Sequence, residues 1–419
     1  MIAYLCGLLV ALWPVAALAA PGAQDTTLLG DLVREALSRS PEIESAREQM
    51  AAAGARILQE SSLPPPELIF MREGMPSFRY ADAMFSRVEL MQMIPFPTKL
   101  SVRRDIAEIG AEHAHHDHME KEFDVLYRLK SAYAELWYLQ QSILLTRRNG
   151  DLLRQTLDVV RARYGAGNAG EEDVLKAALE SARNDNLVVS LRQQELAAKS
   201  MIMGLLDRPE GDTLGTAVIP DSLALDLPCD TLIASAMAYR PMLQHDSLVV
   251  VEQKTMLSAS RQEYIPDFRV GVQYMTAPVT GFNGWTVTAG ITIPFAPWTL
   301  AARGGRIDES EAGVGRAAAD LASARAMVRS QIRDSYSHAA SDREQVAMYR
   351  TTMLPAAEHA LRAALGAYGS GRGDLLMVLD ASRTLRDLMI EERMLRMDFA
   401  RSVAALEKEI GVRDLTYLR

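Results

Sequence analysis

The sequence predicts a mainly helical α+β fold in which long coiled-coil hairpins carry a small number of strands. Three features indicate this fold: a set of motifs that occurs twice, long stretches almost free of proline, and short segments of alternating apolar and polar residues. The composition agrees, because 48% of the residues are hydrophobic while only 6% are aromatic. That balance suits long helices packed closely through small side chains.

The motif Tyr-Gly-small-Gly occurs at Tyr164 and again at Tyr368, and a Val-Leu pair follows each copy. Other landmarks recur in the same order roughly 200 residues later. The matched pairs are Pro66-Glu67 with Pro266-Asp267, Ile94-Pro95-Phe96 with Ile293-Pro294-Phe295, and Val174-Leu175 with Val378-Leu379. We therefore predict two structural repeats, residues 21–220 and 221–419, each with a helical stretch, two strands and a long helical hairpin.

Residues 1–20 are predicted to be a signal peptide. Residues 2–20 carry no charge, and Ala17 and Ala19 form the A-x-A arrangement that precedes a cleavage site. A short membrane anchor is the alternative. Removal of the signal would leave Cys229 as the single cysteine, so no intrachain disulfide could form. No later apolar run approaches the ~18 residues of a membrane helix.

The helical regions are unusually long. Each repeat opens with a helical stretch, at residues 28–60 and 230–263. The stretch from Thr98 to about Arg163 contains no proline, and its counterpart from about Arg306 to Tyr368 contains only Pro355. Sixty-odd helical residues extend about 95 Å. A final helix returns along the last of these, with a coiled-coil seam at Leu385, Leu388, Leu395, Phe399, Leu406 and Ile410.

Glycines mark the turn of each hairpin. Gly165, Gly167, Gly369 and Gly371 are predicted to supply positive-φ positions that end one helix and reverse the chain. Asp173 and Asp374 then fall in the first turn of the returning helix, where the helix dipole favours a carboxylate.

The second repeat has two clear strand candidates, residues 268–274 and 285–293, with glycines in the turn between them. The first repeat has a weaker pair at residues 67–75 and 85–96. Four strands cannot close a barrel, and open strand edges are not tolerated in lipid. The strands must therefore combine across chains, and either a dimer with eight strands or a trimer with twelve satisfies this requirement.

These features together resemble the TolC-type outer-membrane efflux protein family over nearly the whole mature chain. The resemblance rests on the paired Tyr-Gly-x-Gly tips, the two Ile-Pro-Phe exits and the stretch YIPDFRVGVQY at residues 264–274. Residues 93–108, MIPFPTKLSVRRDIAE, are similar to members that serve heavy-metal efflux systems of the resistance-nodulation-division type. The resemblance implies a homotrimer in the outer membrane of a Gram-negative bacterium. Its 12-stranded barrel would continue into a periplasmic tunnel that docks on an adaptor and an inner-membrane pump.

The same resemblance implies a periplasmic gate near the second hairpin tip. Tyr368 matches a tip tyrosine of the family, and Asp380 matches the second aspartate of an Asp-x-x-Asp arrangement. Met377 occupies the first position, which puts a doubled acidic ring in doubt. Asp374, nearer the helix start, is a candidate cap. A solvated helix carboxylate is the alternative interpretation of Asp380.

Four of the seven histidines lie within the segment EHAHHDHMEKE, at His113, His115, His116 and His118. His113 and His116 share one helix face at a spacing that can chelate a transition metal. A polar stretch of the tunnel wall that happens to be rich in histidine is the alternative.

Other function classes have little support. A net charge of −9 without a basic block excludes the usual footprint of nucleic-acid binding. The sequence contains no phosphate loop, nucleophile elbow or His-Glu-x-x-His motif, so neither an enzyme nor a cofactor is expected. A periplasmic coiled-coil adaptor or scaffold and a type I secretion duct remain as alternatives, and the substrate is not predicted.

Overall fold

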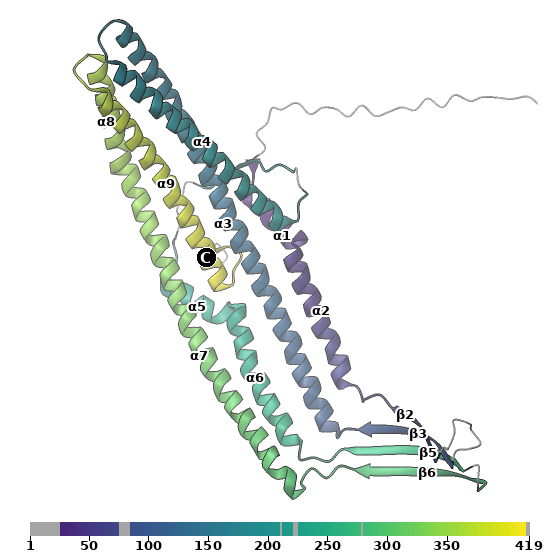
Figure 1. The fold of residues 1–419 in the computed structure, drawn as a ribbon. Coiled ribbons are helices and arrows are strands. Elements are labelled where there is room, and N and C mark those ends of the chain that lie inside the picture. The colour runs from purple at the N-terminus through teal and green to yellow at the C-terminus, as the bar shows by residue number, and fades with distance from the viewer. Residues whose placement is uncertain (1–25, 75–83, 210–211, 221–224, 278–279, 416–419) are drawn as a thin grey trace, which may run out of the picture.

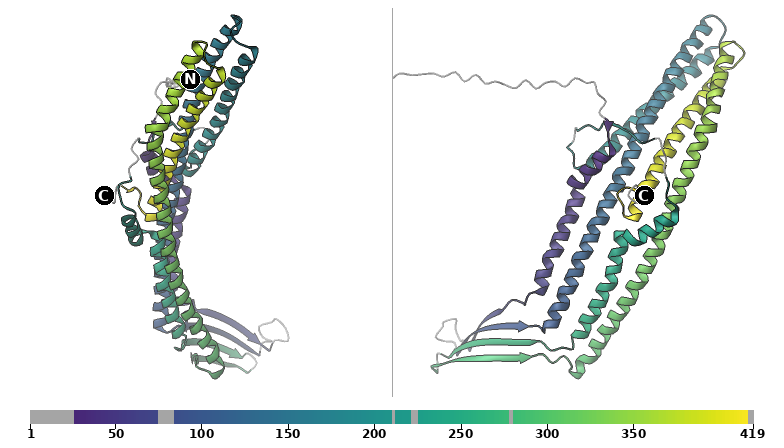
Figure 2. Two further views of the ribbon diagram at one scale, coloured as in Figure 1. Left: turned by 90° about the vertical axis from the view of Figure 1, so that its left-hand side faces the viewer. Right: turned by 180° about the vertical axis from the view of Figure 1, so that it is seen from behind.

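The computed structural model describes residues 26–74, 84–209, 212–220, 225–277 and 280–415. The predicted signal peptide lies outside this part of the chain. Long helices run side by side, with the tips of the two helical hairpins at one end and the strands of a four-stranded sheet projecting from the other (Figure 1). Viewed from the side, the molecule is thin and bent, and the strands turn away from the helix direction (Figure 2).

The same order of elements occurs twice. The first series comprises α1 (Leu29–Arg39), α2 (Pro41–Ser61), β2 (Glu67–Glu73), β3 (Phe85–Ile94), α3 (Pro97–Gly165) and α4 (Glu171–Leu206). The second comprises α5 (Cys229–Tyr239), α6 (Pro241–Gln262), β5 (Phe268–Ala277), β6 (Phe282–Ile291), α7 (Pro297–Met348), a π-helix (Tyr349–Met353), α8 (Leu354–Gly369) and α9 (Leu375–Ile410).

The opening helical stretch of each repeat is divided where we expected a continuous helix. Ser40 and Arg240 have extended backbone, and Pro41 and Pro241 then start the next helix. A residue before proline disfavours the α conformation, whereas proline itself fits the first helical turn. The two prolines therefore divide α1 from α2 and α5 from α6.

The break at Pro355 has a different form. The expected interruption is a π-helix from Tyr349 to Met353, and Pro355 lies in the first turn of α8 directly after it. Its counterpart α3 continues from Pro97 to Gly165 without interruption. The long helix of the first hairpin is therefore continuous, whereas that of the second hairpin is interrupted. Among the described residues, no helix is long and apolar enough to cross a bilayer.

The four strands form one antiparallel sheet in the order β2-β3-β5-β6. Its register aligns Leu68, Leu90, Val272 and Val287 in one row, and these apolar side chains are between 40% and 72% exposed. The neighbouring row on the opposite face is more polar and consists of Ile69, Glu89, Gln273 and Thr286. The strands of the first repeat, whose alternation of apolar and polar residues is weak, thus contribute to the same apolar face as the strands of the second repeat.

A small parallel pairing fastens the N-terminal end of the described chain at mid-height. Strand β1 (Thr26–Thr27) pairs with β4 (Thr216–Ala217). The Tyr133 hydroxyl donates to the Thr27 carbonyl at 2.7 Å and accepts from the Val218 amide at 2.8 Å. Tyr133 is 1% exposed and belongs to the hydrophobic core that α3 forms with α1 and α4.

Candidate functional site

The two hairpin tips lie next to each other at the end of the molecule opposite the strands (Figure 1). Arg163, near the end of α3, connects them. Its Nη1 donates to the Tyr368 carbonyl at 2.6 Å, and its guanidinium lies 4.6 Å from the centre of the Tyr368 ring. The last turn of one hairpin is therefore fastened to the last turn of the other.

Each tip turns at one glycine. Gly167 and Gly371 have φ angles of 76° and 75°, and each follows a helix whose last carbonyls accept bonds from the turn. The prediction of positive φ was wrong for Gly165 and Gly369, which are the last residues of α3 and α8. A single left-handed residue is enough to end each helix.

Asp374 is the N-cap of α9, where its Oδ1 accepts from the Leu376 amide at 3.4 Å. Asp173 lies in the first turn of α4, whose N-cap is Gly170. Both carboxylates are thus at the positive end of a helix dipole. Asp374 has a local capping contact within the second tip.

Tyr368 is a core residue at the contact between the tips. It is 6% exposed and packs with Leu157, Val160 and Leu379, whereas Tyr164 in the first tip is 49% exposed. Burial raises the pKa of the Tyr368 hydroxyl, against the opposing effect of Arg163. The ring therefore fixes how the tips pack.

Asp380 lies on the exposed side of α9, together with Met377. Both line a shallow groove between α8 and α9 whose walls are mainly the alanines 357, 360, 363, 364, 367 and 381. At the corresponding place in the first tip, Lys176 forms an ion pair with Glu172 of its own helix. The exposed face of the second tip therefore carries a carboxylate where the first carries a paired lysine.

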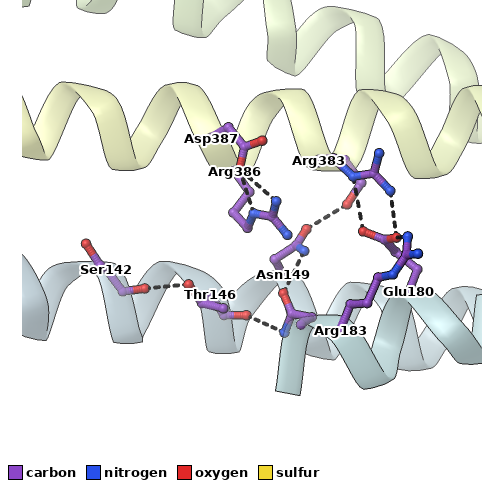
Figure 3. A network of polar contacts seen from close by, with 10 residues as sticks. Ser142, Thr146, Asn149, Glu180, Arg183, Arg383, Arg386 and Asp387 are labelled. Carbon is purple, nitrogen blue, oxygen red and sulfur yellow. Dashed lines mark hydrogen bonds and ion pairs between the residues drawn. The ribbon is translucent and has the colours of Figure 1, made fainter. Parts of the chain in front are cut away.

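A buried polar network behind the tips joins α3 and α4 to α9 (Figure 3). Asn149 donates to Asn184 at 3.0 Å, Asn184 donates to the Thr146 carbonyl at 3.0 Å, and Ser382 donates to Asn149 at 2.6 Å. Asn184 and Ser382 are 1% and 2% exposed. Buried amides and hydroxyls that bond one another across helices favour one alignment of those helices.

An ion pair completes this network. Both nitrogens of the Arg383 fork bond the carboxylate of Glu180, at 2.6 and 3.2 Å, and Arg183 lies 3.7 Å from the same carboxylate (Figure 3). The Glu180 side chain is 8% exposed. The position of α9 against α4 therefore depends on a buried carboxylate that needs its arginine.

A second buried carboxylate lies beside the π-helix. Glu392 on α9 is 2% exposed, and it accepts from Arg350 Nε at 2.7 Å and lies 3.0 Å from Arg393. Tyr349, the first residue of the π-helix, bonds Glu391 at 2.9 Å. Polar contacts thus fix the π-helix between α7 and α8 against α9.

Sequence reasoning missed these polar residues. Asn149, Asn184, Ser382 and Glu180 are residue types that usually face solvent, and no local motif distinguishes them. Their significance depends on which helix faces which, and that follows from the folded arrangement.

Of the four clustered histidines of α3, His113 contacts α6, His115 is exposed and His118 lies beside Glu122 of its own helix. His113 contacts His245 of α6 with ring centres 4.4 Å apart, and its Nε2 lies 3.3 Å from Glu252 Oε2. His116 has its ring 5.6 Å from that of His115. Among the described residues, no three His, Cys, Asp or Glu side chains already form a metal-binding group.

The chain matches the outer membrane efflux protein family over residues 32–206 and 232–412. No curated protein matches it. Several solved structures share its fold. CmeC of Campylobacter jejuni has 14% sequence identity and a TM-score of 0.77, and the match covers 91% of this chain and 85% of CmeC. VceC of Vibrio cholerae has 16% identity and a TM-score of 0.76, with coverage of 92% and 96%. CusC has 14% identity and a TM-score of 0.75, with coverage of 94% and 96%.

The two matched segments together span most of the chain and coincide with the two series of elements. The family consists of channels and not of enzymes. This chain therefore belongs to the outer membrane efflux protein family, the TolC-type channels of the Gram-negative outer membrane.

Proposed function

We propose that this protein is the exit duct of a tripartite efflux system. It would receive substrates from an inner-membrane pump and a periplasmic adaptor and release them outside the cell. The observation that supports this most strongly is the four-stranded sheet, with its exposed apolar face, at one end of long helical hairpins. Family membership argues against the adaptor alternative.

The working unit would be a homotrimer. In the sheet of one chain, β2 and β6 each pair on one side only, and lipid does not tolerate such edges. Three chains joined edge to edge would give a 12-stranded barrel in outer-membrane lipid, and their hairpins would form the periplasmic tunnel. Cross-linking in detergent should yield trimers, and those trimers should conduct ions in planar bilayers. Monomers or dimers alone, or trimers without conductance, would contradict the proposal.

Heavy-metal cations are the candidate cargo, because residues 93–108 resemble members of heavy-metal systems. A type I secretion duct is the second candidate, since it would use the same fold. The pump and adaptor that co-purify with the protein would distinguish the two. A resistance-nodulation-division pump supports efflux, whereas an ATP-driven exporter supports secretion.

The gate would lie at the second tip, with Asp380 facing the axis and Tyr368 and Asp374 fixing the tip behind it. Three copies of Asp380 around the axis would concentrate negative charge and attract cations, most strongly at low salt. Asp380→Ala should therefore reduce cation selectivity in bilayer recordings. Asp374→Ala should mainly loosen the tip, because that side chain caps α9. If the Asp380→Ala channel kept the parent's ion selectivity at low ionic strength, Asp380 would not line the pore.

A further inference from the structure

The seam between α3 and α6 brings together side chains from both repeats that the channel function does not use. His113 and His116 lie one turn apart on α3, and His245 and Glu252 lie two turns apart on α6. The two helices run next to each other and are in contact (Figure 1). The sequence indicated only the α3 side of this cluster.

The two imidazoles on the α3 side lack the hydrogen bonds that buried polar groups normally make. Both ring nitrogens of His113 and the Nδ1 of His116 are inaccessible and make no hydrogen bond of good geometry, although Glu252 Oε2 lies 3.3 Å from His113 Nε2. His245 differs, because its Nδ1 lies 3.3 Å from Asp246 Oδ1. The His113 side chain is 13% exposed and that of Glu252 is 22% exposed. A buried neutral imidazole in this state is costly, because its N–H lacks an acceptor and the lone pair of its other nitrogen lacks a proton donor or a metal ion.

The spacing of the donors suits a metal ion. Bonds of about 2.0–2.1 Å at a tetrahedral angle place two ligand atoms about 3.4 Å apart. His113 Nε2 and Glu252 Oε2 are 3.3 Å apart, and the His245 ring is in contact with His113. A pair of ligands is thus already spaced for an ion. His245 would supply a third ligand by rotating away from two carboxylates, Asp117 at 3.7 Å from its Nε2 and Asp246 at 3.3 Å from its Nδ1.

We propose that the α3–α6 seam binds a divalent transition-metal ion such as Zn²⁺ or Cu²⁺ through His113, His245 and Glu252, with His116 as the fourth ligand. The donor set of imidazoles and one carboxylate is the one these ions prefer. The ion would join the first repeat to the second, and this role does not depend on what the channel carries.

The test uses the full-length protein in detergent, without a histidine tag and after treatment with a chelator. Calorimetric titration with Zn²⁺ and with Cu²⁺ should show one ion per chain. His113→Ala and His245→Ala should each weaken binding by at least roughly tenfold, because even loss of a group that only supports a ligand costs that much. His338→Ala is the matched control, since this histidine is 68% exposed on α7 and far from the seam in sequence.

Two further measurements keep the test decisive if an alanine variant folds poorly. Glu252→Gln retains the shape of the side chain and should also weaken binding. Co²⁺ bound to the parent protein should show the intense visible absorption of a tetrahedral site, and the His245→Ala variant should lose it. No binding by the parent protein, or binding that survives these substitutions or depends on His338, would overturn the proposal.

Discussion

The side chain of Asn184 occupies space that only a glycine at position 150 leaves open. A Cβ on Gly150 would lie 2.7 Å from Asn184 Nδ2, the atom that bonds the Thr146 carbonyl. Gly150→Ala should therefore displace Asn184 at a cost of about 1–3 kcal/mol, against a gain in helix stability of about 0.5–1 kcal/mol, so the net effect should be destabilising. Thermal unfolding of the purified protein should show a lower midpoint.

Gly110→Ala is the matched control, because this glycine also lies inside α3 and has no atom within 4 Å of a Cβ. It should keep or raise the midpoint. If both alanine variants behaved alike, the packing of Asn184 against Gly150 would have no energetic role.

The ion pair between Glu35 and Arg208 gives a pH dependence. Arg208 bonds both oxygens of the carboxylate, at 2.6 and 2.9 Å, and this hydrogen bonding lowers the pKa of Glu35 below its ordinary 4.5. A carboxyl with a lowered folded pKa stabilises the fold above its unfolded pKa and loses that contribution as pH falls through the folded value.

The stability of the parent protein should thus decline as pH falls below about 4.5, and Glu35→Gln should lower stability at pH 7 and flatten that decline. The unfolding midpoints of the parent protein and the variant, measured between pH 7 and pH 3, test this prediction. An equally steep decline in the variant would assign the acid sensitivity to other carboxyls.

Among the elements, α9 depends on the polar network for its position. Arg383→Ala would leave the Glu180 carboxylate buried with only the more distant Arg183. The cost should be below the about 3–5 kcal/mol of a fully buried pair, because the Arg383 side chain is 44% exposed. The second tip should loosen, and bilayer recordings should show longer or larger openings.

Arg362→Ala on the neighbouring helix α8 provides the comparison. Its side chain is 61% exposed and pairs with Glu358 of the same helix, and it therefore does not join α9 to α4. Its recordings should resemble those of the parent protein. Openings that lengthen equally in both variants would point to a general effect of removing charge.

Most elements were predictable because they depend on local chemistry. Pro97 and Pro297 start helices after the two Ile-Pro-Phe exits, and glycines follow the helices at the tips. Pro41 and Pro241 act as locally, but we did not expect them to divide the opening helical stretches. The strand pair of the first repeat was uncertain, since Met71 and Met91 stand on its more polar face and blur the alternation. Only pairing with β5 shows that Leu90 and Val272 share one face.

The site was predictable in part for the same reason. Asp374 and the tip glycines act locally, whereas His245 and Ser382 matter through partners more than 100 residues away. One sequence read along its length does not reveal such partners. The duplication showed that two tips exist, but not that Arg163 joins them.

For the whole molecule, the apolar sheet face should be the surface in contact with lipid. Val287 is 72% exposed on that face, and Thr286 points to the opposite one. Val287→Arg should cost about 2–4 kcal/mol if the position lies near the bilayer midplane, and it should reduce the amount of assembled trimer in outer membranes.

Thr286→Arg is its neighbour and control, and it should assemble nearly as well as the parent. Quantification of trimers on gels of unheated and heated membranes measures both. If Thr286→Arg reduced trimer assembly more than Val287→Arg, the other face of the sheet would be the one in contact with lipid.

The pairing of β3 with β5 also determines when the sheet can form. Ser86 pairs with Thr276, so the two central strands are far apart in the sequence and all of α3 and α4 lies between them along the chain. Contacts of such long sequence separation form slowly, whereas a helical hairpin folds from neighbouring residues. The α3–α4 hairpin should therefore be complete while the pair of strands β2 and β3 still lacks β5, the next strand of the sheet. Their apolar face is then uncovered in the newly exported chain, and this interval is when the protein most needs protection from aggregation.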